Sequence, residues 1–128
     1  MPVIVGVALG GALGASLRYA VDRLIEHHSD AVFPWATFTI NLSGCFAIGL
    51  ISATLIDRHH LPAWLRIGLV MGVVGGYTTF STFEWEALKL VRDGNWPAAL
   101  VYVFGSVAVG FLGVVLGAVT AHLIFGRR

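Results

Sequence analysis

Asn41 is a polar residue inside an apolar stretch, and Thr37, Thr39 and Ser43 lie near it in the sequence. A carboxamide carries two N–H donors that an anion can accept. In an apolar environment such a group is costly unless it is paired or faces water. Asn41 is therefore predicted either to bind an anion or to form a hydrogen bond between two helices. The residue types leave both roles open.

A second stretch, residues 77–83, combines hydroxyl groups with aromatic rings. The hydroxyls belong to Thr78, Thr79, Ser81 and Thr82. Phe80 and Phe83 are three residues apart and share a face if the segment is helical. Because the edge of an aromatic ring is electropositive, ring edges and hydroxyl donors can replace part of a small anion's hydration shell. On spacing alone, ordinary packing of the two rings remains the alternative.

Further polar residues follow. Tyr102 and Ser106 are four residues apart and could extend a polar track along one helix face. Glu84 and Glu86 are predicted to line a vestibule or an interface, with a paired acid–base role as the alternative.

Gly75 and Gly76 come just before the hydroxyl-rich stretch. Backbone carbonyl oxygens at a helix break can coordinate a hard cation. Two chains related by a twofold axis would each supply the same carbonyls. Such a ligand set, without carboxylates, suits a monovalent ion.

Enzymatic chemistry is not expected from the remaining residues. The histidines occur as two adjacent pairs, 27–28 and 59–60, and as the lone His122. Adjacent residues do not share a helix face, so neither pair has metal-ligand spacing. Cys45 is the single cysteine, which excludes an internal disulfide and a cysteine-based zinc site.

Composition places the chain in a membrane. Of 128 residues, 57% are hydrophobic and 12% are charged, against about 25% charged in soluble domains. The mean hydropathy is +0.83. A domain of this size cannot bury so much apolar surface internally, so the surplus is expected to face lipid. The net charge of +1 argues against nucleic-acid binding.

The apolar stretches predict a single all-α membrane domain, residues 1–128, that crosses the membrane four times. A spanning helix needs about 20 apolar residues. The expected spans are 3–21, 36–56, 63–91 and 96–125. Residues 22–35 are expected to form a short polar connection or a brief surface helix.

The third span is predicted to be broken at mid-membrane, near residues 75–79. The apolar stretch before Gly75 has about a dozen residues, or roughly 18 Å of helix, which is too short for a hydrocarbon core of about 30 Å. The apolar stretch before Gly75 and the helical stretch after the break would cross the membrane only if they are joined end to end. Broken membrane helices commonly build ion sites. A re-entrant hairpin or a simple kink is the alternative.

Glycine recurs at every fourth residue in three of the spans, which favours close helix packing in lipid. The positions are 6, 10 and 14, then 68, 72 and 76, then 113 and 117.

Charge near the span ends gives no preferred orientation. Lys and Arg residues on the cytoplasmic side normally set topology. With four spans, the two sides carry equal numbers of them. One side has Arg58, Arg66, Arg127 and Arg128, and the other has Arg18, Arg23, Lys89 and Arg92. Equal numbers predict insertion in both orientations and an antiparallel homodimer. A single orientation fixed by other features is the alternative.

Three motifs resemble those of the Fluc (CrcB) fluoride channels, in order and over essentially the whole chain. They are GGALGASLRY at 10–19, TFTINLSG at 37–44 and GGYTTFSTF at 75–83, of which the last is the most specific. The resemblance implies a multi-pass protein of a bacterial-type cytoplasmic (inner) membrane. It also implies an antiparallel dual-topology homodimer that exports fluoride passively and lowers cellular fluoride.

By position, the resemblance assigns a pore and a metal site. Pore residues would be Asn41, Phe80 and Phe83, with a polar track of Thr39, Ser81, Thr82, Tyr102 and Ser106 and with Glu86 near its end. The backbone carbonyls of Gly75 and Thr78 would hold a central sodium ion (Na+) shared by the two subunits. Arg18 would have a structural or electrostatic role.

Departures from the family pattern are small. Tyr77 stands where a smaller apolar residue is common, and Gly110 stands where a serine can occur. Two other functions are the alternatives. A small multidrug-type transporter of dual topology needs a carboxylate in the first span, and residues 3–21 contain none. A non-transporting structural subunit would explain the glycines but not the broken span with Asn41.

Overall fold

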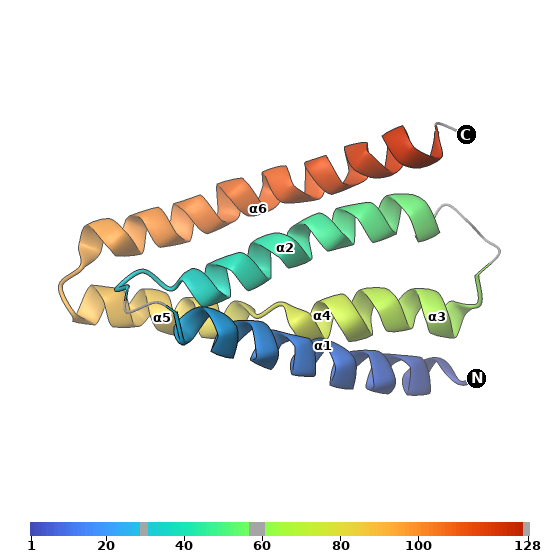
Figure 1. Ribbon diagram of the computed structural model, residues 1–128, viewed down its shortest axis with the longest axis horizontal. Coiled ribbons are helices and arrows are strands. Elements are labelled where there is room, and N and C mark those ends of the chain that lie inside the picture. The colour runs from blue at the N-terminus through green and yellow to red at the C-terminus, as the bar shows by residue number, and fades with distance from the viewer. Residues whose placement is uncertain (29–30, 57–60, 127–128) are drawn as a thin grey trace.

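The computed structural model describes residues 1–28, 31–56 and 61–126, in which all regular structure is helical. This confirms the all-α prediction. The chain runs back and forth as four antiparallel rods, with both termini at the same end (Figure 1). The helices are α1 Val3–Glu26, α2 Trp35–Ile51 with a π-helical continuation η1 Ser52–Ile56, and α6 Trp96–Phe125. The third rod comprises α3 Ala63–Ile67, π-helix η2 Gly68–Val74, α4 Gly75–Tyr77 and α5 Phe80–Arg92.

Three helices of the described chain are long and apolar enough to cross a membrane: Val3–Glu26, Trp35–Leu55 and Trp96–Phe125. The pieces of the third rod are individually too short, but they lie end to end beside α1 (Figure 1). The chain is thus a multi-pass membrane protein by the length and composition of its helices. The helix α1 continues to Glu26 and includes residues predicted as a polar connection from position 22.

Backbone packs directly on backbone between α1 and η2. Gly6, Gly10 and Gly14 are buried in α1. A methyl group added at any of them would overlap a carbonyl oxygen of the third rod, those of Trp64, Gly68 and Val73 respectively. The glycines therefore determine how closely these two rods approach.

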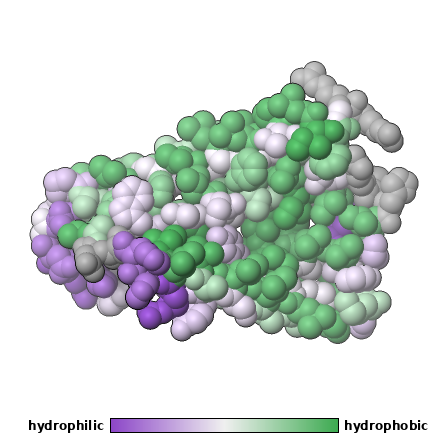
Figure 2. Space-filling model, in the orientation of Figure 1, coloured by the Kyte–Doolittle hydropathy of each residue, from purple (hydrophilic) through white to green (hydrophobic). Residues whose placement is uncertain are grey.

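The face of the molecule seen in Figure 2 is apolar over most of its length, whereas hydrophilic residues gather at the end where α5 meets α6. Leu9, Phe104 and Phe111 are each more than half exposed. Exposed side chains of this kind suit contact with lipid. Of the residues in the charge comparison, Arg58, Arg127 and Arg128 lie outside the described residues, as do His59 and His60.

Candidate functional site

The third rod is interrupted at Thr78 and Thr79. Thr78 (ψ 159°) and Thr79 (φ −149°, ψ 116°) are both extended. The backbone N–H and the hydroxyl of Thr78 each donate to the Val74 carbonyl at 3.0 Å, which closes the last turn before the break. The Thr79 hydroxyl then accepts the backbone N–H of Thr82 at 3.3 Å and caps α5. The third rod thus consists of two helical parts joined by two extended residues.

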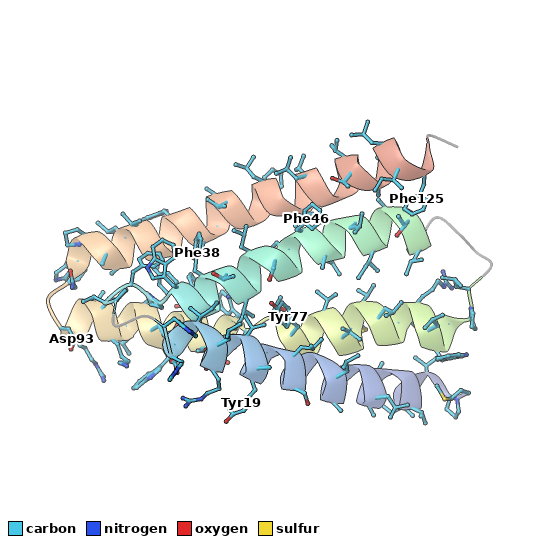
Figure 3. All side chains as sticks on the ribbon, viewed as in Figure 1. Tyr19, Phe38, Phe46, Tyr77, Asp93 and Phe125 are labelled. Atoms are coloured by element: carbon cyan, nitrogen blue, oxygen red, sulfur yellow. The ribbon has the colours of Figure 1, made fainter. Side chains whose placement is uncertain are left out.

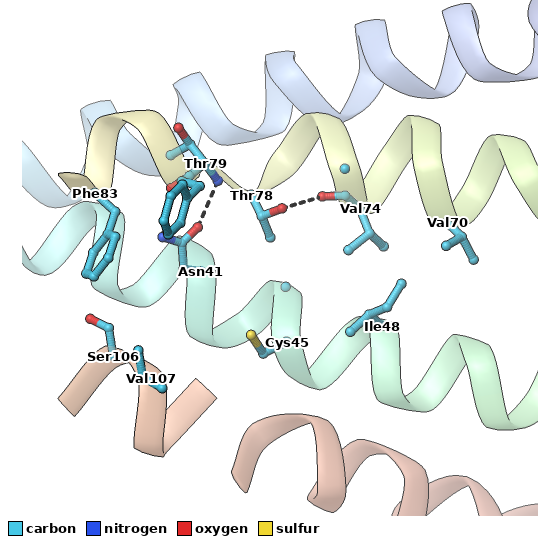
Figure 4. Close-up of a pocket in the computed structure, with 13 residues that line it drawn as sticks. Asn41, Cys45, Ile48, Val70, Val74, Thr78, Thr79, Phe83, Ser106 and Val107 are labelled. Atoms are coloured by element: carbon cyan, nitrogen blue, oxygen red, sulfur yellow. Dashed lines mark hydrogen bonds between the residues drawn. The ribbon is translucent and has the colours of Figure 1, made fainter. Parts of the chain in front are cut away.

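Asn41 satisfies the backbone at this break. Its Nδ2 donates to the Thr79 carbonyl at 3.0 Å, and its Oδ1 accepts the Thr79 N–H at 2.8 Å (Figure 4). In an unbroken helix this N–H would bond to the Gly75 carbonyl. One N–H of the Asn41 carboxamide is not used in this pair of bonds. The interhelical role left open by the sequence is therefore present, and a donor remains for a ligand.

A cavity of about 400 Å³ lies beside the break, between α2, the third rod and α6 (Figure 4). Asn41, Thr78, Thr79 and Ser106 give it polar atoms, and Phe80 and Phe83 give it aromatic rings. The Ser106 Oγ is buried and has no hydrogen-bond partner among the described residues. The cavity thus combines an unpaired hydroxyl, an amide and ring surfaces in an otherwise apolar wall.

The two phenylalanines of the break have different environments. Phe83 is 5% exposed, and its ring centroid lies 5.0 Å from that of Tyr102. Phe80 is 74% exposed, although its ring is only 5.8 Å from that of Phe83. Phe83 therefore belongs to the core of its own chain, whereas Phe80 projects from it.

Beyond Phe83, polar contacts continue toward the end of α5 and the start of α6. Glu86 accepts a hydrogen bond from the Tyr102 hydroxyl at 2.6 Å and one from the Thr37 hydroxyl at 2.9 Å. Tyr102 is 0% exposed and Thr37 is 1% exposed. We call Thr37, Glu86 and Tyr102 the polar triad; it comes from α2, α5 and α6.

Other residues predicted for the pore lie elsewhere. Thr39 borders a different, apolar groove between α2 and α6, together with Leu42 and Phe46. Ser81 and Thr82 are exposed and do not line the cavity. The sequence interpretation missed Thr37 as a site residue. Its position four residues before Asn41 was the available signal, because residues four apart share a helix face.

Glu84 is exposed, whereas Glu86 is half-buried and bonded within the polar triad. The two carboxylates thus have different surroundings. Tyr77 and Gly110, the departures noted in the sequence, also have partners: the Tyr77 hydroxyl lies 2.9 Å from Ser43 Oγ, and a methyl group at Gly110 would lie 3.3 Å from the sulfur of Cys45.

The carbonyls predicted to hold sodium are those of Gly75 and Thr78, which both border the cavity. Because Thr79 donates its N–H to Asn41, the Gly75 oxygen loses its usual helical partner. The Thr78 oxygen accepts a long bond, 3.5 Å, from Arg18 Nη1 and keeps a second lone pair. The described residues hold no group of three or more His, Cys, Asp and Glu suited to a metal. Neutral oxygens of this kind fit a hard monovalent cation.

Comparison with known proteins gives one consistent family. The family described as CrcB-like protein, Camphor Resistance (CrcB), matches residues 5–118. A protein of Acidobacterium capsulatum named fluoride-specific ion channel FluC is 47% identical over 120 residues, covering 92% of this chain and 94% of its own.

Two further proteins with the same name give similar matches. That of Paramagnetospirillum magneticum is 46% identical over 120 residues (92% of this chain, 94% of its own). That of Solibacter usitatus is 44% identical over 116 residues (91% and 95%). With this identity over nearly the full length, the chain belongs to the CrcB family.

Proposed function

We propose that this chain forms a fluoride-specific ion channel, not an enzyme, that lets fluoride leave the cell down its electrochemical gradient. The relatives named fluoride-specific ion channel FluC support this function. The observation in the structure that carries it is the cavity beside the break, which the unpaired Ser106 hydroxyl, the Asn41 amide and the Phe83 ring line together.

The physical task is to replace the water around a small, strongly hydrated anion. Contacts along the path must be favourable but individually weak, so that the ion enters and also leaves. Ser106 and Asn41 supply O–H and N–H donors, and the phenylalanines supply electropositive ring edges. The polar triad continues this path from Phe83 toward the end of α5 and the start of α6.

The exposed ring of Phe80 supports assembly of two copies. An aromatic ring at 74% exposure beside a cavity lined by its neighbour Phe83 leaves the site incomplete in one chain. The equal division of Lys and Arg between the two sides supports an antiparallel, dual-topology homodimer with two pathways. The apolar outer surface supports placement in the cytoplasmic (inner) membrane of a bacterium.

A sodium ion is the proposed cofactor of this dimer. The Gly75 and Thr78 carbonyls of both copies would hold it, and it would supply a fixed positive charge that braces the interface and offsets anion repulsion. Arg18 contacts the same Thr78 oxygen and adds a second positive charge there. Arg18 therefore has an electrostatic role at the break in this proposal.

Other functions are less well supported. In α1 no acidic residue precedes Asp22, so a proton-coupled multidrug-type transporter lacks its carboxylate. A structural subunit would not need the unpaired hydroxyl in the cavity.

Efflux from liposomes tests the proposal. Purified protein is reconstituted with valinomycin to balance charge, and ion-selective electrodes follow fluoride and chloride. Rapid fluoride efflux without chloride efflux is expected. A folded protein that releases neither ion would leave the structural-subunit function as the better account.

A further inference from the structure

Phe33 lies in the segment between α1 and α2 and is part of a group of aromatic rings. Its ring centroid is 4.6 Å from that of Trp35, 5.7 Å from that of Phe38 and 5.3 Å from that of Tyr102. The rings of Phe33 and Tyr102 meet at 83°, an edge-on arrangement. Phe33 thus connects a surface segment with a fully buried member of the polar triad.

Local backbone structure explains why this ring turns inward. The Phe33 carbonyl accepts the Trp35 N–H at 2.8 Å, which makes a tight turn just before α2. Pro34 in the middle of this turn restricts the backbone of the preceding residue to extended conformations. The half-buried Phe33 side chain then packs against the core cluster that includes Phe83, Ala99 and Tyr102. Figure 3 shows the nearby Phe38 in the same group of side chains, close to the start of α2.

The polar triad is not far from water. Tyr102 is six residues from the start of α6 at Trp96, and Glu86 is six residues from the end of α5 at Arg92. At 1.5 Å per residue both lie only about 9 Å from a helix end. Tyr102 is nevertheless 0% exposed in a single chain, so residues of the same chain cover it.

We propose that Phe33 is a positioning residue for conduction: its ring seals the polar triad from water at the end of the molecule where α5 meets α6, and it holds the Tyr102 hydroxyl against Glu86. This inference rests on the proposed function, because it concerns one end of the proposed fluoride path. Trp35, which is 48% exposed and has no ring contact with Tyr102, serves as the neighbouring residue at the surface. Sealing and positioning therefore fall to Phe33 and not to its neighbour.

The test uses a reporter cysteine in full-length protein. In a Cys45→Ala background, Ala99→Cys places a thiol in the buried cluster beside Tyr102, where Ala99 is 3% exposed. Labelling by a charged, water-soluble methanethiosulfonate reagent is timed in liposomes. Asp93→Cys, at an exposed position, controls for reagent activity. Fluoride efflux is measured on the same preparations and compared with the background protein.

With Phe33→Ala, we expect the reporter to label about tenfold faster as water gains access. Fluoride efflux should fall about fivefold, the size of a lost edge-on ring contact. Phe33→Leu should keep the seal, with slow labelling, but show the reduced efflux because it lacks the ring edge. Trp35→Ala should change both rates by less than about twofold.

The inference is overturned if Phe33→Ala leaves the labelling rate unchanged, or if Trp35→Ala raises it as much. If Phe33→Ala does not fold, Phe33→Leu decides: efflux equal to the background contradicts the positioning role. If the unmodified protein carries no fluoride, the proposed function fails, and the labelling rates alone still decide whether Phe33 seals the triad.

Discussion

The α1–η2 seam and the region between α2, α5 and α6 are built from different groups. Across the seam, backbone meets backbone, and there is no room for a methyl group at Gly10 or Gly14. Between α2, α5 and α6, side chains make the contacts, with Asn41 bonded to the break and Glu86 bonded to Tyr102. The cavity and the unpaired Ser106 hydroxyl both belong to this second region.

The difference indicates that the two regions have separate tasks: the seam holds the helices together, and the region between α2, α5 and α6 provides the proposed ion path. Packing of glycine against carbonyl brings the backbones of α1 and the third rod into direct contact, so the seam gives rigidity. Packing through side chains leaves a gap whose polar atoms can be directed at an ion. Substitutions in the seam should therefore act mainly on stability, and substitutions in the second region should act mainly on fluoride efflux.

Gly14→Ala should break the seam. The added methyl group would overlap the Val73 carbonyl oxygen, which belongs to a rigid helix. We expect a loss of more than about 3 kcal/mol in the free energy of unfolding, measured by titration from mild detergent into SDS. Gly11→Ala is the matched control, since a methyl group there meets nothing within 4 Å, and its effect should stay within about 0.5 kcal/mol. Equal effects would show that the seam does not depend on these contacts.

Asn41→Leu should damage the second region while sparing the seam. The change removes both hydrogen bonds to Thr79 and leaves a buried N–H and carbonyl unpaired. The free energy of unfolding should fall by about 2–3 kcal/mol, and fluoride efflux should fall more than tenfold. Asn41→Asp keeps the acceptor for the Thr79 N–H but adds charge. Compared with Asn41→Leu, Asn41→Asp should restore the free energy of unfolding more fully than it restores fluoride efflux. If Asn41→Asp restores both, an anion-facing role for the carboxamide is contradicted.

Tyr102→Phe removes one hydroxyl from the polar triad. The lost bond to the Glu86 carboxylate is short, 2.6 Å, and buried. Fluoride efflux should slow roughly tenfold, corresponding to about 1.5 kcal/mol, the lower end for a hydrogen bond to a charged group. Tyr19→Phe, at a residue that is 68% exposed, should leave efflux unchanged. Unchanged efflux in Tyr102→Phe would place the path elsewhere.

Tyr77→Phe should have the smallest effect. The Tyr77 hydroxyl lies 2.9 Å from Ser43, on an exposed side of α2 and outside the cavity lining. Thermal unfolding should shift by the equivalent of about 0.5–1 kcal/mol, and fluoride efflux should stay within twofold of the unmodified protein. A large loss of efflux would show that this departure from the family pattern has become part of the path.

Sequence reasoning was most informative where a rule acts locally. Glycines at every fourth residue indicate close packing, and a short apolar stretch followed by Gly75–Gly76 and hydroxyls indicates a break. The expected spans were less well defined at their polar ends. The helix α1 continues through Asp22 and Arg23 to Glu26, because a helix that leaves the membrane can continue in water.

The choice between Thr37 and Thr39 shows a limit of the sequence. Both are threonines in an apolar helix, and residues two apart point in different directions around it. Only the arrangement of α5 and α6 shows that Thr37 meets Glu86 whereas Thr39 borders another groove. The inward turn of Phe33 likewise depends on the path of the segment between α1 and α2. Amino-acid composition does not determine that path.

Fluoride efflux of Phe83→Ile compared with Phe111→Ile tests most directly whether the α2–α5–α6 region conducts. Phe83 is 5% exposed in the cavity wall, whereas Phe111 is 69% exposed on the outside of α6, so the same change is made inside and outside the proposed path. Both variants are checked for monodispersity and reconstituted at equal density. We predict that Phe83→Ile loses fluoride efflux while Phe111→Ile retains it. Normal efflux from a folded Phe83→Ile protein would contradict a path through this region.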